Sequence, residues 1–262
     1  MINFNRVFAM IYRYTINMRH SFDRITDMFY WPAMDILIWG LTSAYFLKNN
    51  PDQNHLQFAI IGGLVFWIVV WRAQYEVTTN LLAELWDKNI VNIFASPLKL
   101  SEWVTAFMLF GFIKTIISFS FSLFIAFLLY GFSIVPIGLF LFPIMVNLIL
   151  SGWAAGFLVA GFLIRYGGTI QTLAWAGVYL IAPFSAVYYS LGTLPAWAQQ
   201  VSHFLPTSYM FEGIRQLLFT GTMSSDKLLI SFVLNIIYLS ISLRFFFYMF
   251  NKSKKLGLGR LI

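Results

Sequence analysis

Six stretches of mostly apolar residues, each about as long as a lipid bilayer is thick, make up most of this chain. A helix needs roughly 20 apolar residues to cross the hydrocarbon core of a membrane, whereas a strand of a membrane barrel needs only about 10. The length and continuity of the stretches therefore predict an all-α integral membrane protein with six transmembrane helices. We place them at residues 29–47, 58–78, 103–130, 134–164, 169–190 and 228–250.

Charge is scarce, and its placement predicts the topology. Charged residues make up 10% of the 262 residues and hydrophobic residues 60%, whereas a soluble domain has about 25% charged residues. We expect residues 1–262 to form one membrane domain. The positive-inside rule places both basic ends in the cytoplasm, which an even number of spans allows. These charges form no single patch for nucleic acid. The basic residues at the two ends are Arg6, Arg13, Arg19, Arg24, Lys252, Lys254, Lys255 and Arg260.

An amphipathic helix is predicted before the first span, within residues 1–27. Over residues 4–25, apolar side chains recur at helical spacing on one face, and basic side chains recur on the opposite face. Such a helix lies in the membrane interface. We expect it to turn at about Tyr30–Trp31 into the first span, with Pro32 in the first turn, where a missing N–H costs little.

The most polar internal stretch, residues 79–102, joins the second and third predicted spans on the cytoplasmic side. Glu84 and Lys88 are four residues apart, in the order that stabilises a helix, and the helix should end before Pro97. One hypothesis is a helix that docks on a soluble partner; a solvated connector is the other. The candidate docking residues are Leu82, Glu84, Leu85, Trp86, Asp87, Lys88, Ile90 and Phe94.

Residues 191–222 are too apolar for a simple loop and too interrupted for a span. Pro195 and Pro206 each stand where a short helix can begin. We predict a re-entrant pair of helices that enters the outer leaflet and returns, because broken backbone at that depth must be buried in protein or line a wet cavity. The candidate gate residues of this segment are Trp197, Tyr209, Glu212 and Arg215.

Charged residues inside the spans are functional candidates, because each costs roughly 2.5–3.5 kcal/mol to insert. Arg72 and Glu76 are four residues apart and can pair, which favours a neutralised pair that locks helices over contact with a substrate. Lys114 favours helix packing or snorkelling. Asp35 has no local partner and is the better candidate for lining a polar path.

Several signatures of catalysis and metal binding are missing from the sequence. The three histidines, His20, His55 and His203, lie in different regions and predict no metal site. The phosphate-binding loop, the serine elbow and the zinc-protease pair are all absent. We therefore expect a non-catalytic chain that binds no cofactor of its own. A step of two glycines four residues apart, Gly152 and Gly156, favours close packing of two helices.

The order of these segments resembles the membrane subunit of ABC-2 type exporters. NIFASPLKLSEW, at residues 92–103, is similar to that family's ASPL element. LPAWAQQVSHFLPTSYMFEGIRQLL, at residues 194–218, is similar to its LP-x-W…P-x-x-Y-x-x-E-x-x-R element. The resemblance covers essentially the whole chain.

The resemblance implies a function and a set of partners. Two copies would pair in the bacterial inner membrane and bind two separate ATPase subunits, which would use ATP and magnesium. The helix around residues 82–94 would lie in a groove of each ATPase. Substrate would leave between the copies, and the candidate path residues Asp35, Arg72 and Glu76 would lie on or near that path. The family includes exporters of lipid-linked polysaccharides and of hydrophobic drugs or natural products, and the sequence does not choose between them.

Two other classes of protein are weighed against this hypothesis. An ion-coupled secondary transporter predicts internal repeats and midplane carboxylates, but no clear repeat is seen and only Asp35 and Glu76 are suitable. A membrane enzyme that modifies lipid predicts a cluster of acids, histidines or serines at one membrane face, and the sequence supplies none.

Overall fold

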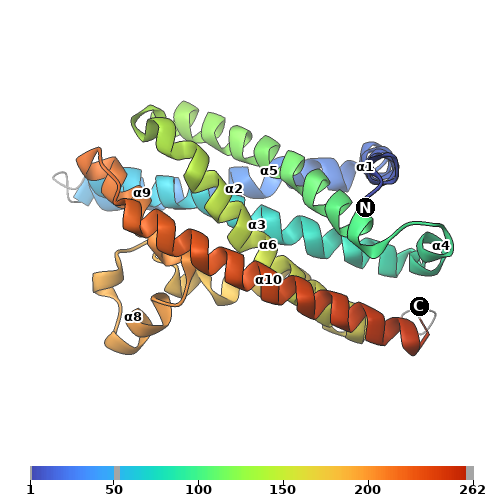
Figure 1. The fold of residues 1–262 in the computed structure, drawn as a ribbon. Helices are drawn as coiled ribbons and strands as arrows, with labels where there is room; N and C mark the ends of the chain where they lie inside the picture. The colour runs from blue at the N-terminus through green and yellow to red at the C-terminus, as the bar shows by residue number, and fades with distance from the viewer. Residues whose placement is uncertain (1, 50–53, 258–262) are drawn as a thin grey trace.

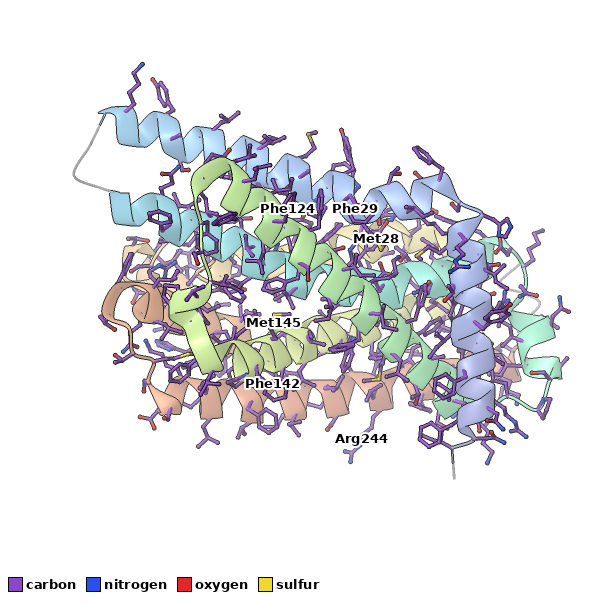
Figure 2. All side chains as sticks on the ribbon, turned by 90° about the horizontal axis from the view of Figure 1, so that it is seen from above. Met28, Phe29, Phe124, Phe142, Met145 and Arg244 are labelled. Atoms are coloured by element: carbon purple, nitrogen blue, oxygen red, sulfur yellow. The ribbon has the colours of Figure 1, made fainter. Side chains whose placement is uncertain are left out.

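The computed structural model describes residues 2–49 and 54–257, and in these ranges the chain is helical with no strand. Five long helices run side by side, and a sixth, α1, lies across one end of them (Figures 1 and 2). Arg260 of the predicted basic tail lies outside the described residues. The long helices and α1 are α1 (Phe4–Arg19), α2 (Phe22–Asn49), α3 (Asn54–Trp86), α5 (Leu100–Tyr130), α6 (Leu141–Tyr166) and α10 (Ser225–Lys255).

Short elements join the long helices at both ends of the bundle. The N-terminus, α4 and the last described turn of α10 lie at one end, and α8 and α9 lie toward the other (Figure 1). The short elements are α4 (Ile90–Ala95), η2 (Val135–Phe140), η3 (Gly167–Ile170), α7 (Thr172–Ala176), η4 (Gly177–Leu180), η5 (Ala182–Phe184), η6 (Leu191–Thr193), α8 (Ala196–Ser202) and α9 (Pro206–Thr220).

Four helical stretches of the described chain are long and apolar enough to cross a membrane: Gln57–Trp86, Leu100–Tyr130, Val135–Ile170 and Ser225–Lys255. They coincide with four of the six predicted spans. The prediction at 29–47 falls within α2, whose tryptophans, tyrosines, Pro32 and Asp35 lower its mean hydropathy. The structure therefore supports an all-α membrane protein with four candidate spans.

The predicted span at 169–190 is not one helix. It divides into η3, α7, η4 and η5, and Ala186 then adopts a positive φ of 56°. Pro183 removes a backbone donor from this stretch, and Gly177 packs so closely on Val159 that a Cβ there would lie 2.7 Å from it. The apolar composition reflects burial of a broken segment, since Ala182, Ala186 and Val187 are all buried.

The boundary between the first two helices differs from the prediction. The helix that begins the chain ends at Arg19, and α2 begins at Phe22. The expected turn at Tyr30–Trp31 is therefore wrong, and Pro32 lies inside α2, which continues through it. The short α1 still lies crosswise to the long helices, as Figure 2 shows, and buries Val7, Met10 and Tyr14 against them.

The predicted helix around residues 82–94 is also divided. The helix of the second span continues to Trp86, breaks at Lys88, whose φ is 53°, and resumes as α4. Glu84 and Lys88 are therefore not a helical pair, which corrects the sequence argument. The predicted end before Pro97 is confirmed, because α4 ends at Ala95. Two helices meeting at a tight turn make a compact hairpin, which we call the coupling hairpin (residues 82–95).

The helix α3 lies at the centre of the bundle and contacts α2, α5, α6 and α9. Its contact with α6 depends on the two glycines that the sequence singled out. A Cβ on Gly152 would lie 2.5 Å from the Val70 carbonyl oxygen, and one on Gly156 would lie 3.1 Å from Val77 Cβ. The absence of these side chains lets the two backbones approach closely, as glycine steps do in membranes.

This contact predicts the effect of the smallest possible substitution. Gly152→Ala forces a methyl group into the α3–α6 contact and should cost about 1–3 kcal/mol of stability. The melting temperature of the detergent-purified protein, followed by tryptophan fluorescence, should fall. Gly168→Ala is the control, because no heavy atom lies within 4 Å of the added Cβ. Equal melting temperatures for the two variants would contradict close packing at Gly152.

Candidate functional site

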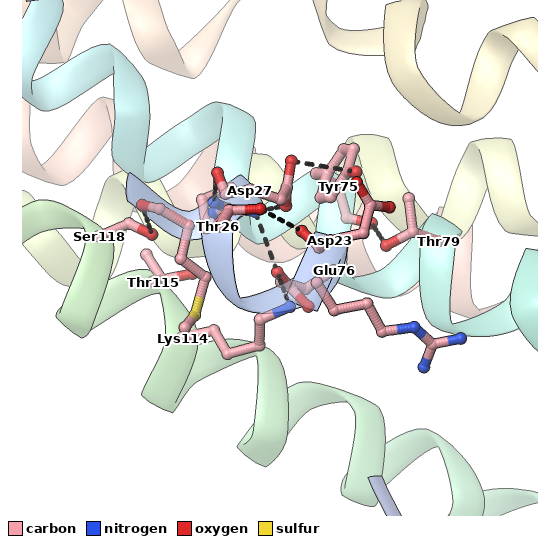
Figure 3. A network of polar contacts seen from close by, with 12 residues as sticks. Asp23, Thr26, Asp27, Tyr75, Glu76, Thr79, Lys114, Thr115 and Ser118 are labelled. Carbon is pink, nitrogen blue, oxygen red and sulfur yellow. Dashed lines mark hydrogen bonds and ion pairs between the residues drawn. The ribbon is translucent and has the colours of Figure 1, made fainter. Parts of the chain in front are cut away.

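Four charged side chains from three helices form a buried network, and Figure 3 labels three of them, Asp27, Glu76 and Lys114. Arg72 of α3 donates to Asp27 of α2 over 2.6 Å and to Glu76 of its own helix over 3.2 Å. Lys114 of α5 reaches Glu76 Oε1 over 2.6 Å. We call this set, Asp27, Arg72, Glu76 and Lys114, the central charge network.

The central charge network is neutral and almost sealed from solvent. Arg72 and Glu76 have no exposed side-chain area, and Lys114 and Asp27 have 7% and 14%. Arg72 also donates to the Asp27 carbonyl oxygen over 2.8 Å, and Asn80 donates to the Glu76 carboxylate. Two cations and two carboxylates balance each other, which is the condition for keeping charges away from water.

The sequence predicted only part of this arrangement. The Arg72–Glu76 pair is confirmed, and so is a helix-packing role for Lys114; the snorkelling alternative is wrong, because its ammonium binds Glu76. Asp27 was missed because it precedes the predicted span. Counting the buried charges predicts a second acidic partner, because two buried cations, Arg72 and Lys114, need two carboxylates and Glu76 supplies only one.

The central charge network predicts that a second substitution restores part of the stability that a first one removes. Glu76→Gln leaves the Lys114 ammonium buried without a carboxylate and should cost about 3–5 kcal/mol. Adding Lys114→Met removes the orphaned charge and keeps the Asp27–Arg72 pair, so part of the stability should return. Thermal unfolding of both single variants and the double variant measures the coupling between them. A double variant that loses the sum of the two single effects would show that Lys114 and Glu76 do not depend on each other.

A second set of ion pairs fastens α1 to the coupling hairpin. Arg13 donates to both carboxylate oxygens of Glu84, over 2.8 and 2.9 Å, and Asn89 donates to Glu84 Oε2 over 3.2 Å. A bidentate guanidinium–carboxylate pair fixes orientation as well as distance. Burial lowers the pKa of Arg13, but the hydrogen bond to Glu84 and its negative charge raise it, and the net shift is upward.

The start of α1 is held in the same way at the start of α5. Glu102, which is fully buried, accepts hydrogen bonds from the backbone N–H groups of Asn3 and Lys99, each over 2.9 Å. Arg6 lies 3.5 Å from the same carboxylate. In the middle of α1, the Trp103 indole donates to the Tyr14 hydroxyl over 2.8 Å. The contacts of Glu84, Glu102 and Trp103 therefore hold α1 along its length.

The eight predicted docking residues include both buried and solvent-exposed side chains. Leu82, Glu84, Leu85 and Ile90 are buried in this chain, and Phe94, which is half-buried, packs on Trp103 and Phe250. At the turn of the coupling hairpin Trp86, Asp87 and Lys88 are exposed, and Trp86 has 56% of its surface free. Val91 and Asn92, which the sequence argument did not include, extend this exposed surface onto α4.

The predicted pair Glu212–Arg215 is present, and it holds the broken segment before η6. Arg215 lies 2.7 Å from Glu212 and donates to the carbonyl oxygens of Ala186 and Tyr189, over 2.8 and 2.9 Å. Glu212 accepts from the Leu191 backbone N–H over 2.7 Å. The pair therefore replaces the helical hydrogen bonds that this backbone lacks.

The short helices of the same region begin where the sequence predicts. Pro206 is the first residue of α9, and Pro195 immediately precedes α8. Trp197 is 63% exposed and meets Phe184 edge-on, with the ring centroids 5.8 Å apart. Tyr209 donates from its hydroxyl to the His203 carbonyl oxygen over 3.0 Å. These contacts order the two helices, whose re-entrant position in a membrane stays a prediction.

Asp35 stands apart from these ion pairs. It lies on a half-buried face of α2, separate from Arg72 and Glu76 although all three were predicted to line a path. In residues 2–49 and 54–257 no cluster of acidic residues and histidines forms a candidate metal site. What the described chain offers is a set of helices fastened by buried charge, with an exposed hairpin at one end.

These features define a helical integral membrane protein in which buried ion pairs connect neighbouring helices. The family model for the ABC-2 type transporter matches residues 6–219. That match covers well over half of the chain, so the chain belongs to the ABC-2 type transporter family. Membrane components of this family are generally non-catalytic and work with ABC ATPase subunits. No curated protein matches the chain significantly.

Proposed function

We propose that this chain is the permease subunit of an ATP-driven exporter and that a separate ABC ATPase hydrolyses the ATP. Two copies pair in the bacterial inner membrane, with both termini in the cytoplasm, and form the path for a lipid-linked polysaccharide or a hydrophobic drug or natural product. The observation that carries the proposal is the coupling hairpin: an exposed turn on a helix end that buried ion pairs fasten to the rest of the bundle.

The exposure of the hairpin supports a division of roles. Trp86, Asp87 and Lys88 present an aromatic ring and two opposite charges to solvent. Large aromatic side chains are frequent anchors in protein interfaces. Leu82, Leu85 and Ile90 face inward, so we assign them to the packing of the hairpin. Glu84 is buried against Arg13 and is assigned the transfer of hairpin movement to α1.

Solvent exposure also distinguishes the three candidate path residues from one another. Arg72 and Glu76 have no exposed side-chain area in the chain described here. We therefore assign them the support of the path, because they hold α2 against α3 and α5. Asp35, which is half-buried, is the candidate that faces the path. Trp197, Tyr209, Glu212 and Arg215 would order its outer gate.

The experiment is association with an ATPase. The full-length chain, co-expressed with an ABC ATPase subunit from the same host, should retain that subunit during purification in detergent. Trp86→Ala should cost about 2 kcal/mol of binding energy, as anchor residues do, which is roughly a 30-fold weaker dissociation constant.

A matched control separates a local effect from a general one. Phe204→Ala removes a similarly exposed aromatic side chain in the region of α8 and α9, and the ATPase should still bind with the original affinity. Failure of every ABC ATPase subunit of the host to associate would overturn the proposal. So would equal retention of the ATPase by wild type and by a variant that carries both Trp86→Ala and Lys88→Glu.

A further inference from the structure

Asp35 is a carboxylate without a polar partner in an otherwise apolar stretch of α2. In the described part of the chain it makes no hydrogen bond and no ion pair, whereas the buried acids Glu76, Glu84 and Glu102 each have a cationic partner. Residues 29–47 of α2 are a predicted span, and an acid inside a span, which costs roughly 2.5–3.5 kcal/mol to insert, is expected to serve a function. Packing does not explain Asp35, because neither of its carboxylate oxygens bonds another residue of the described chain.

Two tryptophans lie on the same side of α2 as this carboxylate, and two tyrosines of the broken segment at residues 169–190 lie near it. Trp31 and Trp39 lie four residues before and after Asp35, hence on the same side of α2, and are 51% and 39% exposed. Trp39 stacks on Tyr188, with the ring centroids 5.0 Å apart and the planes 17° apart. Asp35 lies within electrostatic range of Tyr179 and Tyr188. These five residues form the Asp35 surface.

The chemistry of the Asp35 surface favours ligands that carry a positive charge. A carboxylate that lacks an internal cation attracts an external one, and the attraction strengthens where water is scarce. The faces of tryptophan and tyrosine rings attract cations by about 0.5–2 kcal/mol each. An anionic headgroup, such as the phosphate of a lipid carrier, would be repelled by the carboxylate of Asp35. None of the five residues of the Asp35 surface is a cation that would offset this repulsion.

We propose that the Asp35 surface binds hydrophobic organic cations, and that the exporter therefore takes cationic amphiphiles as its substrate class. This inference rests on the proposed export function and narrows it, since it favours the drug and natural-product class over lipid-linked polysaccharides. The aromatic rings accept the apolar body of the substrate, and the carboxylate neutralises its charge.

The test uses two probes of nearly equal shape and opposite charge. Tetraphenylphosphonium and tetraphenylborate are titrated into the detergent-purified full-length chain, and binding is followed by quenching of tryptophan fluorescence. The cation should bind at least tenfold more tightly than the anion. Asp35→Asn should weaken binding of the cation tenfold or more and leave the melting temperature unchanged, because the carboxylate bonds no other residue of the described chain.

Asp226→Asn is the matched control. It removes the same charge from an exposed position in the first turn of α10, and binding of the cation should not change. Equal binding of both probes, an Asp35→Asn variant that binds the cation as wild type does, or a large loss of thermal stability in that variant would overturn the inference. Retention of the ATPase by Asp35→Asn shows that the export function stands independently. Loss of the ATPase by the wild-type chain would refute that function and leave the cation measurement intact.

Discussion

The fully buried guanidinium of Arg72 is the constraint on which the arrangement of α2, α3 and α5 depends. A cation in that position requires carboxylates within contact distance, and they come from α2 and from the next turn of α3. Glu76 in turn needs Lys114 of α5 to balance the network. Three mostly apolar helices thereby acquire one register relative to each other.

The same principle operates at the two ends of the bundle. At one end, Glu84 pairs with Arg13 and Glu102 pairs with Arg6, so α1 is fastened to the coupling hairpin and to the start of α5. In the region of α8 and α9, Glu212 and Arg215 hold the backbone that follows η5. Asp35 has no such ion pair in the described residues, and this separates it from the acids that fasten the helices.

The sequence predicts the class of fold and many local features, for reasons that are local. Apolar length predicts four spans that the structure supports, and Pro97, Pro195 and Pro206 predict helix boundaries because proline acts on its own neighbours. It does not predict the break at Lys88, the division of 169–190 or the partnership of Asp27 with Arg72. Those features depend on tertiary contacts, such as Gly177 against Val159, between residues distant in the chain. The sequence also does not distinguish, among the predicted docking residues, the side chains that pack inward from those that stay exposed, because a residue's place in a helix does not specify what the helix packs against.

The proposed function requires that α1 and the coupling hairpin move as one unit when the bound ATPase closes. Pulsed electron spin resonance tests it most directly, with spin labels at Tyr12, which is exposed on α1, and at Ala95, which is exposed at the end of α4 and is not a predicted docking residue. The distance between these labels within one chain should stay the same in the nucleotide-free and ATP-trapped complexes, while the distance between the Ala95 labels of the two copies changes. A Tyr12–Ala95 distance that shifts by several ångströms on ATP binding, or Ala95 labels that stay fixed, would contradict the proposal.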